Sequence, residues 1–144
     1  MAHITIPTEF PSRAEPAAVV TGEHVRFTVL TSRMIRMEYS QHNRFEDRAS
    51  QAFWYRRQPV PEFQLTQSPD GVAGDHIDIE TEHLHLSYRV TDAGFTMNTL
   101  SIELKGSGVT WRFGDRDHHN LRGTARTLDG ANGEIDLEPG LMSR

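Results

Sequence analysis

Histidine and aspartate side chains are the first residues in this chain whose types and spacing could do chemistry. His83 and His85 are two positions apart in a segment with strand-like alternation, so both imidazoles are expected on one face. Asp117, His118 and His119 follow in a loop further along the chain. Two or three histidines and a carboxylate can bind a divalent metal ion inside a small β-barrel.

The alternation around the histidines argues against such a metal centre. Leu84 and Leu86 occupy the apolar face of the segment, so His83 and His85 are expected to face solvent. The ligands of a barrel metal site must point inward. A cupin-like metal-binding small barrel is kept as a further alternative, and the favoured expectation is a chain with no metal site and no cofactor.

Residues 40–59 are dense in charged and aromatic side chains, and they contain the consecutive aromatics Phe53, Trp54 and Tyr55. Together with Trp111 these rings could stack on a sugar, which would make the chain a carbohydrate-binding β-sandwich module. Consecutive aromatics within a strand are more often divided between the core and an interface. Sugar binding is therefore an alternative and not the main expectation.

No catalytic residue can be assigned from composition or motifs. Glycosidases need two carboxyl groups at a set separation, but the 20 acidic residues allow too many pairs for a count to select one. The sequence has no Ser/His/Asp arrangement, no glycine-rich phosphate loop and no dinucleotide-binding fingerprint. The residues alone therefore indicate no catalytic site.

Length and charge limit the classes of protein to consider. The 144 residues suit one domain with an ordinary core. The 15 basic and 20 acidic residues give a net charge of −5, which argues against nucleic acid or an anionic membrane as a partner. Cysteine is absent, which excludes disulfides and thiolate metal sites. The first residues do not resemble a signal peptide and no run suits a membrane span, so a cytoplasmic location is expected.

Alternation of apolar and polar residues predicts short β-strands along most of the chain. Residues 25–29 and 35–39 alternate on either side of a short polar turn, which indicates a β-hairpin with one buried face. Arg36 and Glu38 are expected on its outer face as a solvated cross-strand ion pair. Similar patterns follow at residues 59–67, 77–80, 84–89, 100–104 and 109–113.

Turn signals separate these segments, and one of the clearest is the sequence at residues 68–71. No part of the chain shows the periodicity of a helix. Roughly eight short strands with turns between them are typical of an antiparallel β-sandwich, so the predicted fold class is all-β. Residues 1–17 contain Pro7, Pro11 and Pro16 and are expected to form an extended arm.

The last part of the chain, residues 120–144, has neither helical nor strand periodicity. Its glycines, at 123, 130, 133 and 140, suit backbone that turns left-handed or passes close to another segment. Polar side chains that can hydrogen-bond this loop to itself are Thr124, Arg126, Thr127, Asp129 and Asn132. The segment also has more apolar side chains than a solvated tail would carry: Leu121, Leu128, Ile135, Leu137, Leu141 and Met142.

These residues also carry a family resemblance. The run from Asn120 to Asp129 is similar to the part of glycoside hydrolase family 31 that leads from an N-terminal β-sandwich into the catalytic barrel. The similarity continues at Gly133, Leu137, Glu138, Gly140, Leu141, Ser143 and Arg144. Residues 45–51 and 77–90 resemble further elements of the family, so the resemblance covers roughly residues 18–144. Arg122 departs from the pattern, because many relatives have a second glycine there.

The resemblance implies a galactose-mutarotase-like β-sandwich at residues 18–119 and a loop at residues 120–144 that leads toward a catalytic barrel lying outside this sequence. Family members include α-glucosidases and α-xylosidases, which cleave α-glycosidic bonds with retention, and both catalytic carboxylates come from the barrel. The chain is therefore expected to be a noncatalytic N-terminal domain that supports the barrel and helps to wall the substrate pocket.

Partners and a weak candidate site follow from the same resemblance. Leu141, Ser143 and Arg144 lie closest to the junction with the barrel and are the expected contacts to substrate. The expected partners are the barrel and the carbohydrate substrate, with no nucleic acid and no membrane. Apolar side chains of the tail that no barrel covers would favour a homodimer.

Overall fold

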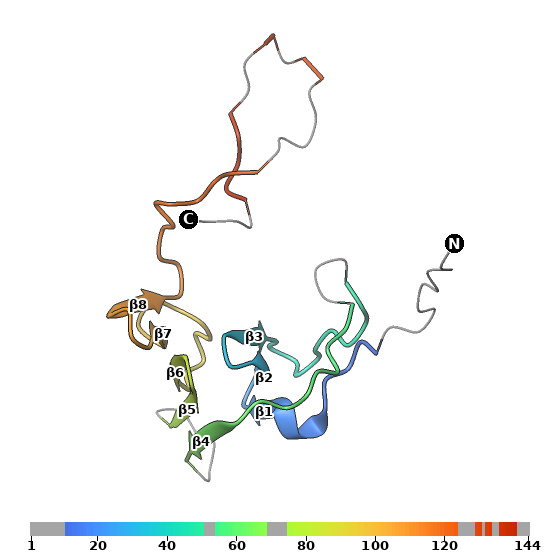
Figure 1. The fold of residues 1–144 in the computed structure, drawn as a ribbon, viewed down its shortest axis with the longest axis vertical. Helices are drawn as coiled ribbons and strands as arrows, with labels where there is room; N and C mark the ends of the chain where they lie inside the picture. The colour runs from blue at the N-terminus through green and yellow to red at the C-terminus, as the bar shows by residue number, and fades with distance from the viewer. Residues whose placement is uncertain are drawn as a thin grey trace, which may run out of the picture. The chain divides into compact units, whose positions relative to one another are not determined.

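The computed structural model describes residues 11–50, 54–68, 75–123, 129–130, 132–133 and 136–140. The chain separates into two compact units, Met1–Gly114 and Asp115–Arg144, and each is described here by itself. The strands belong to the first unit (Figure 1). No helix among the described residues has the length and hydropathy needed to cross a bilayer.

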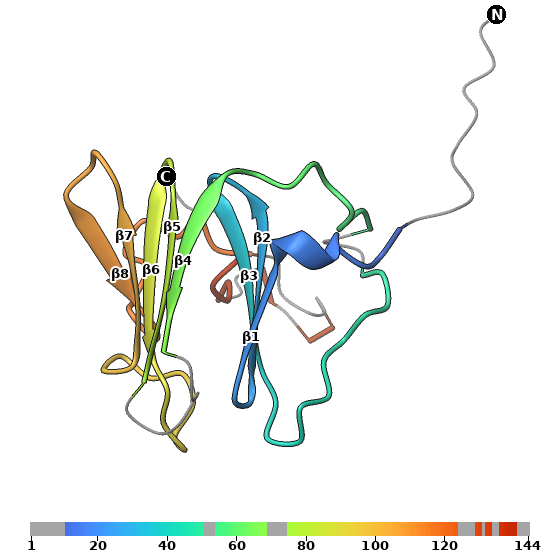
Figure 2. The same ribbon diagram turned by 90° about the horizontal axis from the view of Figure 1, so that it is seen from below.

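Two antiparallel sheets make up the first unit, and Figure 2 shows them as two groups of neighbouring strands. The smaller sheet has the order β1-β2-β3 and the larger sheet the order β4-β5-β6-β7-β8, so both are meanders. A short 3-10 helix, η1 (Pro16–Ala18), precedes them. The strands are β1 (Val19–Gly22), β2 (Val25–Thr31), β3 (Met34–Tyr39), β4 (Phe63–Gln67), β5 (His76–Thr81), β6 (Leu84–Arg89), β7 (Leu100–Leu104) and β8 (Val109–Arg112).

Strand β2 supplies most of the smaller sheet's contribution to the core. Val25, Phe27 and Val29 alternate along it, are buried and belong to the central apolar cluster. The pairing of β2 with β3 shifts between Val29 and Thr31, as in a β-bulge, and Leu30 within this irregularity is also buried. The predicted hairpin is thus confirmed, with one local departure from strict alternation.

One row of cross-strand partners runs across the whole of the larger sheet: Leu65, Ile79, Leu86, Ile102 and Trp111. Ile79 and Leu86 at its centre are completely buried, whereas Leu65 on the edge strand is exposed. Apolar side chains that face each other on neighbouring strands stabilise a sheet by packing. The row explains why alternation in each separate strand produces one continuous apolar face.

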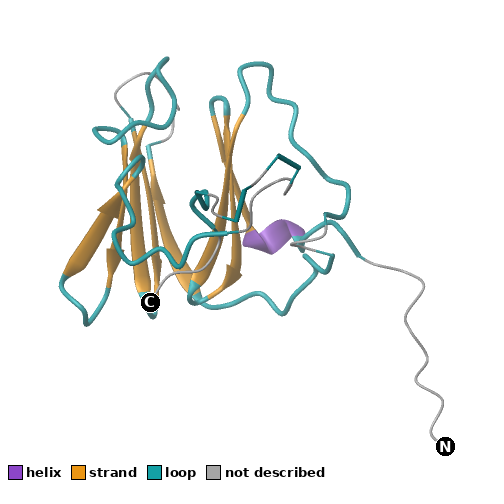
Figure 3. Cartoon of the chain, turned by 90° about the horizontal axis from the view of Figure 1, so that it is seen from above, coloured by secondary structure: helices purple, strands orange, loops and turns teal. Residues whose placement is uncertain are grey.

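The core lies between the two sheets, which Figure 3 shows as two groups of strands joined by irregular chain. The ring of Phe27 from β2 lies 5.7 Å from that of Tyr88 in β6 and 5.8 Å from that of Phe95. Tyr88 and Phe95 meet edge to face at 5.3 Å. Aromatic pairs at these separations add to the free energy gained from burial. The predicted all-β sandwich is confirmed.

The predicted strands are confirmed apart from some of their ends. Strand β4 begins at Phe63 and not at Pro59, and Phe113 follows β8 instead of lying within it. Pro16, expected in an extended arm, opens η1, because proline has the backbone φ that the first helical position needs. Two predicted features lie partly outside the described residues. These are the extended arm, of which residues 1–10 are not described, and the turn at residues 68–71, which is not described from residue 69 onward.

The second unit closes on itself through backbone and amide hydrogen bonds. Asn120 Nδ2 donates to the carbonyl oxygen of Gly140 at 2.8 Å, and the Gly140 amide donates to Asn120 Oδ1 at 2.8 Å. The Gly123 amide donates to the carbonyl oxygen of Glu138 at 2.7 Å. A Cβ atom on Gly140 would lie 2.6 Å from the Arg122 carbonyl oxygen, so the approach requires glycine. The predicted close approach is confirmed at this glycine.

The cross-strand partners Ile79 and Leu65 provide a matched test of the core. Ile79→Ala should lower the free energy of unfolding by about 3 kcal/mol, because it removes buried methyl groups and leaves a cavity. Leu65→Ala should have a much smaller effect, since this partner is exposed on the edge strand. Urea denaturation measures both. Equal losses for the two variants would show that the sheets do not pack as described.

Candidate functional site

Charged side chains gather on the outer face of the smaller sheet. Arg26 of β2 and Glu38 of β3 are cross-strand partners. Arg26 Nε donates to Glu38 Oε2 at 2.7 Å and Arg26 Nη2 donates to Oε1 at 3.1 Å, which makes a two-pronged ion pair. Arg36 lies two residues before Glu38 on the same strand, and its Nη2 is 2.7 Å from Glu38 Oε1. One carboxylate therefore serves two guanidinium groups.

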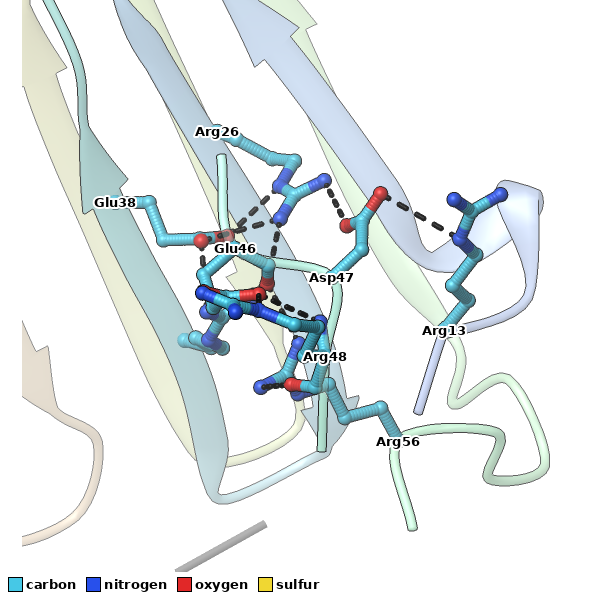
Figure 4. Close-up of polar contacts among 8 residues, drawn as sticks. Arg13, Arg26, Glu38, Glu46, Asp47, Arg48 and Arg56 are labelled. Carbon is cyan, nitrogen blue, oxygen red and sulfur yellow. Dashed lines mark hydrogen bonds and ion pairs between the residues drawn. The ribbon is translucent and has the colours of Figure 1, made fainter. Parts of the chain in front are cut away.

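The loop after β3 adds a second carboxylate to this face. Asp47 Oδ1 accepts from Arg26 Nη1 at 2.7 Å, as Figure 4 shows, and Asp47 Oδ2 lies 3.5 Å from Arg13 Nε. The Glu46 carbonyl oxygen accepts from Arg26 Nη2 at 3.3 Å. The Arg26 guanidinium also lies 4.9 Å from the ring centre of Phe45, a cation–π distance. Arg26 thus joins the loop to the sheet through charge, backbone and ring contacts.

Arg56 holds the far side of the same loop. Its side chain is only 4% exposed, and it donates from Nη1 to the Glu46 carbonyl oxygen at 2.7 Å and from Nη2 to the Arg48 carbonyl oxygen at 2.8 Å. Its backbone amide donates to the carbonyl oxygen of Pro11 at 3.0 Å. Its Nε has no hydrogen-bond partner among the described residues. We refer to Arg13, Arg26, Arg36 and Arg56 as the arginine cluster.

The arginines shift the pKa values of their neighbours. A hydrogen bond from Arg26 lowers the pKa of Asp47, and a hydrogen bond from the Arg48 side chain lowers the pKa of the exposed Glu46 to about 2. Burial acts to lower the pKa of Arg26, but the hydrogen bonds with Glu38 and Asp47 together raise it. These groups stay charged at neutral pH.

Arg36 differs from Arg26 in its balance of charge. Burial lowers the pKa of Arg36; Glu38 opposes this shift, while the nearby Arg56 and Arg26 add to it. Burial is therefore the main cause of the lowered pKa of Arg36, and the two neighbouring arginines contribute in the same direction.

The burial of Arg36 and Glu38 corrects an expectation. They were predicted to form a solvated cross-strand ion pair, but both lie on β3 and their side chains are 19% and 12% exposed. Thr28 of β2, also on this face, is buried. The reason is that the loop after β3 lies against the face and replaces water as the partner of Arg26 and Arg36. The sequence analysis did not identify Asp47 and Arg56 as members of this site. The feature that could have indicated them is the high density of charged residues at 40–59.

The substrate contacts predicted from the family resemblance, Leu141, Ser143 and Arg144, lie outside the described residues. The adjoining described segment shows which side chains brace this unit. Asn120 binds Gly140 from both its amide atoms, and Arg122 Nη1 donates to the Leu137 carbonyl oxygen at 3.1 Å. Neither side chain was among the polar groups predicted to close the loop.

The histidines have separate surroundings. His83 precedes β6 and is not part of it, because Thr81 Oγ1 accepts the amides of both His83 and Leu84 and forms a turn there. The Nδ1 atom of His83 lies 3.1 Å from Ser32 Oγ, so His83 contacts the smaller sheet's hairpin. His85 lies on β6 with Nε2 3.3 Å from Asp78 Oδ1. His83 therefore lies just outside the strand that was expected to carry both imidazoles, and the two side chains have different partners.

The described ranges contain no group of three or more His, Asp or Glu side chains that could hold a metal ion. His118 and His119 belong to the second unit, whereas His83 and His85 belong to the first. The hypothesis of a cupin-like metal barrel thus has no geometric support in this part of the chain.

The aromatic residues considered for sugar stacking lie in different parts of the first unit. Trp54 and Tyr55 are exposed and lie in the irregular loop after β3, and Phe53 lies outside the described residues. Trp111 is half-buried on β8, with its ring 6.3 Å from that of Phe113. Sugar stacking on these rings stays a prediction.

Comparison with known proteins finds no match to this chain among family models or among curated proteins. The site has to be interpreted from its own geometry. Its acids are engaged by arginine, which suits a structural or anion-recognising role. A general acid requires the opposite perturbation, a raised carboxyl pKa.

Glu38 is the carboxylate whose loss tests this arrangement. Glu38→Gln should lower the free energy of unfolding by about 3 kcal/mol, because Arg26 and Arg36 lose the counter-charge that they share in a mostly buried site. Glu103→Gln is the matched control, since Glu103 is an exposed residue of β7 whose Oε2 lies 4.0 Å from His85 Nδ1. Chemical denaturation compares them. A loss for Glu38→Gln no larger than for the control would contradict the interpretation.

Proposed function

We propose that this chain is a noncatalytic β-sandwich domain of a retaining α-glycosidase related to glycoside hydrolase family 31, with α-glucosidase-like activity in the whole enzyme. In this role the domain supports the catalytic barrel and helps to wall the pocket that takes the carbohydrate substrate. The proposal joins the sequence resemblance to the sandwich fold and to the geometry of the segment in which the resemblance is strongest.

The observation that carries the proposal is the backbone of Arg122. Its φ is 62°, in the left-handed region where glycine is favoured, and many members of the family have glycine at this position. This departure from the family pattern therefore falls where the chain still adopts the backbone that a glycine would take. Gly140, another residue of the pattern, is required by its close approach to the Arg122 carbonyl group.

The charge pattern of the first unit supports a noncatalytic role. Asp47 and Glu46 have lowered pKa values because arginines hydrogen-bond them. A retaining glycosidase needs one carboxyl group that stays protonated to act as the acid and a second that attacks the sugar. Carboxylates held by arginine in this way are poor proton donors at neutral pH.

Apolar side chains offer surface to a supporting contact. In the second unit, Leu121 and Leu137 are 45% and 42% exposed. In the first unit, Val109 and Phe113 at the end of the larger sheet are exposed as well. We assign such side chains to contact with the barrel, with self-association as a homodimer when the barrel is not bound.

The noncatalytic role predicts that the purified chain does not hydrolyse aryl α-glucosides above the rate in buffer. Metal-independent hydrolysis that scales with protein concentration would overturn it. The supporting role is tested by co-expression with a family 31 barrel from the same source, followed by affinity purification of the barrel.

The chain should co-purify with that barrel, and combining Leu121→Ser with Leu137→Ser should reduce the amount recovered. Leu65→Ser, which changes an exposed leucine on β4 at the opposite edge of the larger sheet from Val109, is the matched control and should leave recovery unchanged. A barrel that is equally soluble and active without the chain, and that does not bind it, would contradict the supporting role.

A further inference from the structure

A hollow of about 350 Å³ lies on the outer face of the first unit, beside the smaller sheet. Every member of the arginine cluster lines it, together with Thr28 and Asp47. Its volume is at the lower end of the range for small-molecule sites, about 300–1,000 Å³. The hollow therefore suits a small ligand better than a polymer.

The charges around the hollow do not balance. Four guanidinium groups, those of Arg13, Arg26, Arg36 and Arg56, face two carboxylates, those of Glu38 and Asp47. The Glu46 carboxylate does not change this count, because Arg48 binds it with a 2.6 Å contact outside the lining of the hollow. Two positive charges are left over. Arg26, Arg36 and Arg56 are mostly shielded from water, whereas Arg13 at the edge of the hollow is exposed.

Hydrogen-bond donors are left over as well. Arg56 is almost fully buried, yet its Nε has no partner among the described residues. The contacts described for Arg36 use Nη2, and the contact described for Arg13 uses Nε. The Arg56 Nε atom is itself shielded from solvent. Arg13 and Arg36 line the hollow, so a ligand that supplies acceptor oxygens can bind the donors that their described contacts do not use.

We propose that this hollow is a binding site for a small oxyanion of the phosphate class. Phosphate has the charge that the two unbalanced guanidinium groups require, and arginine binds its oxygens through paired N–H donors. The site is separate from the proposed glycosidase role and does not depend on it. A carboxylate group has oxygen acceptors of the same kind, so a small carboxylate is the other ligand that the experiment must distinguish.

Calorimetric titration with inorganic phosphate tests the proposal, with sodium chloride added to keep ionic strength constant. The unaltered chain should bind phosphate saturably at one site and gain thermal stability as phosphate rises. Arg13→Gln and Arg36→Gln should each weaken binding roughly tenfold, which is the usual effect of losing a charged hydrogen bond. Arg33→Gln is the matched control, because Arg33 is exposed in the β2–β3 turn and carries the same charge.

The Arg13 variant keeps the test valid if Arg36→Gln does not fold, since the Arg13 side chain is 76% exposed. A parallel titration with acetate separates the sources. Weaker binding of acetate than of phosphate supports the phosphate class, whereas acetate binding as tight as phosphate, and sensitive to the same two variants, would overturn that assignment in favour of carboxylates. No saturable binding of either anion would overturn the proposal. An equal loss of binding in Arg33→Gln would also overturn it, because net charge alone would then explain the effect.

Discussion

The structure of the smaller sheet depends on how Arg26 is neutralised. A guanidinium group on a mostly buried face is stable only when carboxylates and carbonyl oxygens surround it. Glu38 supplies the first carboxylate from the neighbouring strand, and Asp47 supplies the second from the loop after β3. The loop must therefore lie against the sheet, and its own carbonyl groups then become acceptors for Arg36 and Arg56.

This constraint gives the smaller sheet two covered faces. On one face Phe27 packs into the apolar core beside Tyr88, while on the other Thr28 and Arg26 lie beneath a charged loop. The two faces obey different chemistry, because the core is stabilised by burial of apolar area and the outer face by paired charges. The surplus of arginine on the outer face is what turns a structural contact into a candidate anion site.

Alternation predicted the strands because the period of two is a property of local sequence. Val25, Phe27 and Val29, or Leu86 and Tyr88, show which face is buried without any knowledge of their neighbours. The contacts of Asp47 and Arg56 could not be predicted in this way, because the loop has no periodic pattern. Asp47 binds Arg26, which is 21 residues away, and Arg56 binds Glu46, which is 10 residues away. Asn120 was missed for the same reason: its partner, Gly140, is 20 residues away.

Hydrogen exchange of the Arg26→Gln variant tests the central claim that Arg26 holds this loop on the sheet. The loop amides at residues 43–50 should exchange much faster than in the unaltered chain. Amides in β5 and β6 should keep their protection, because they belong to the core of the larger sheet. Unchanged exchange at residues 43–50 in a folded variant would contradict the claim.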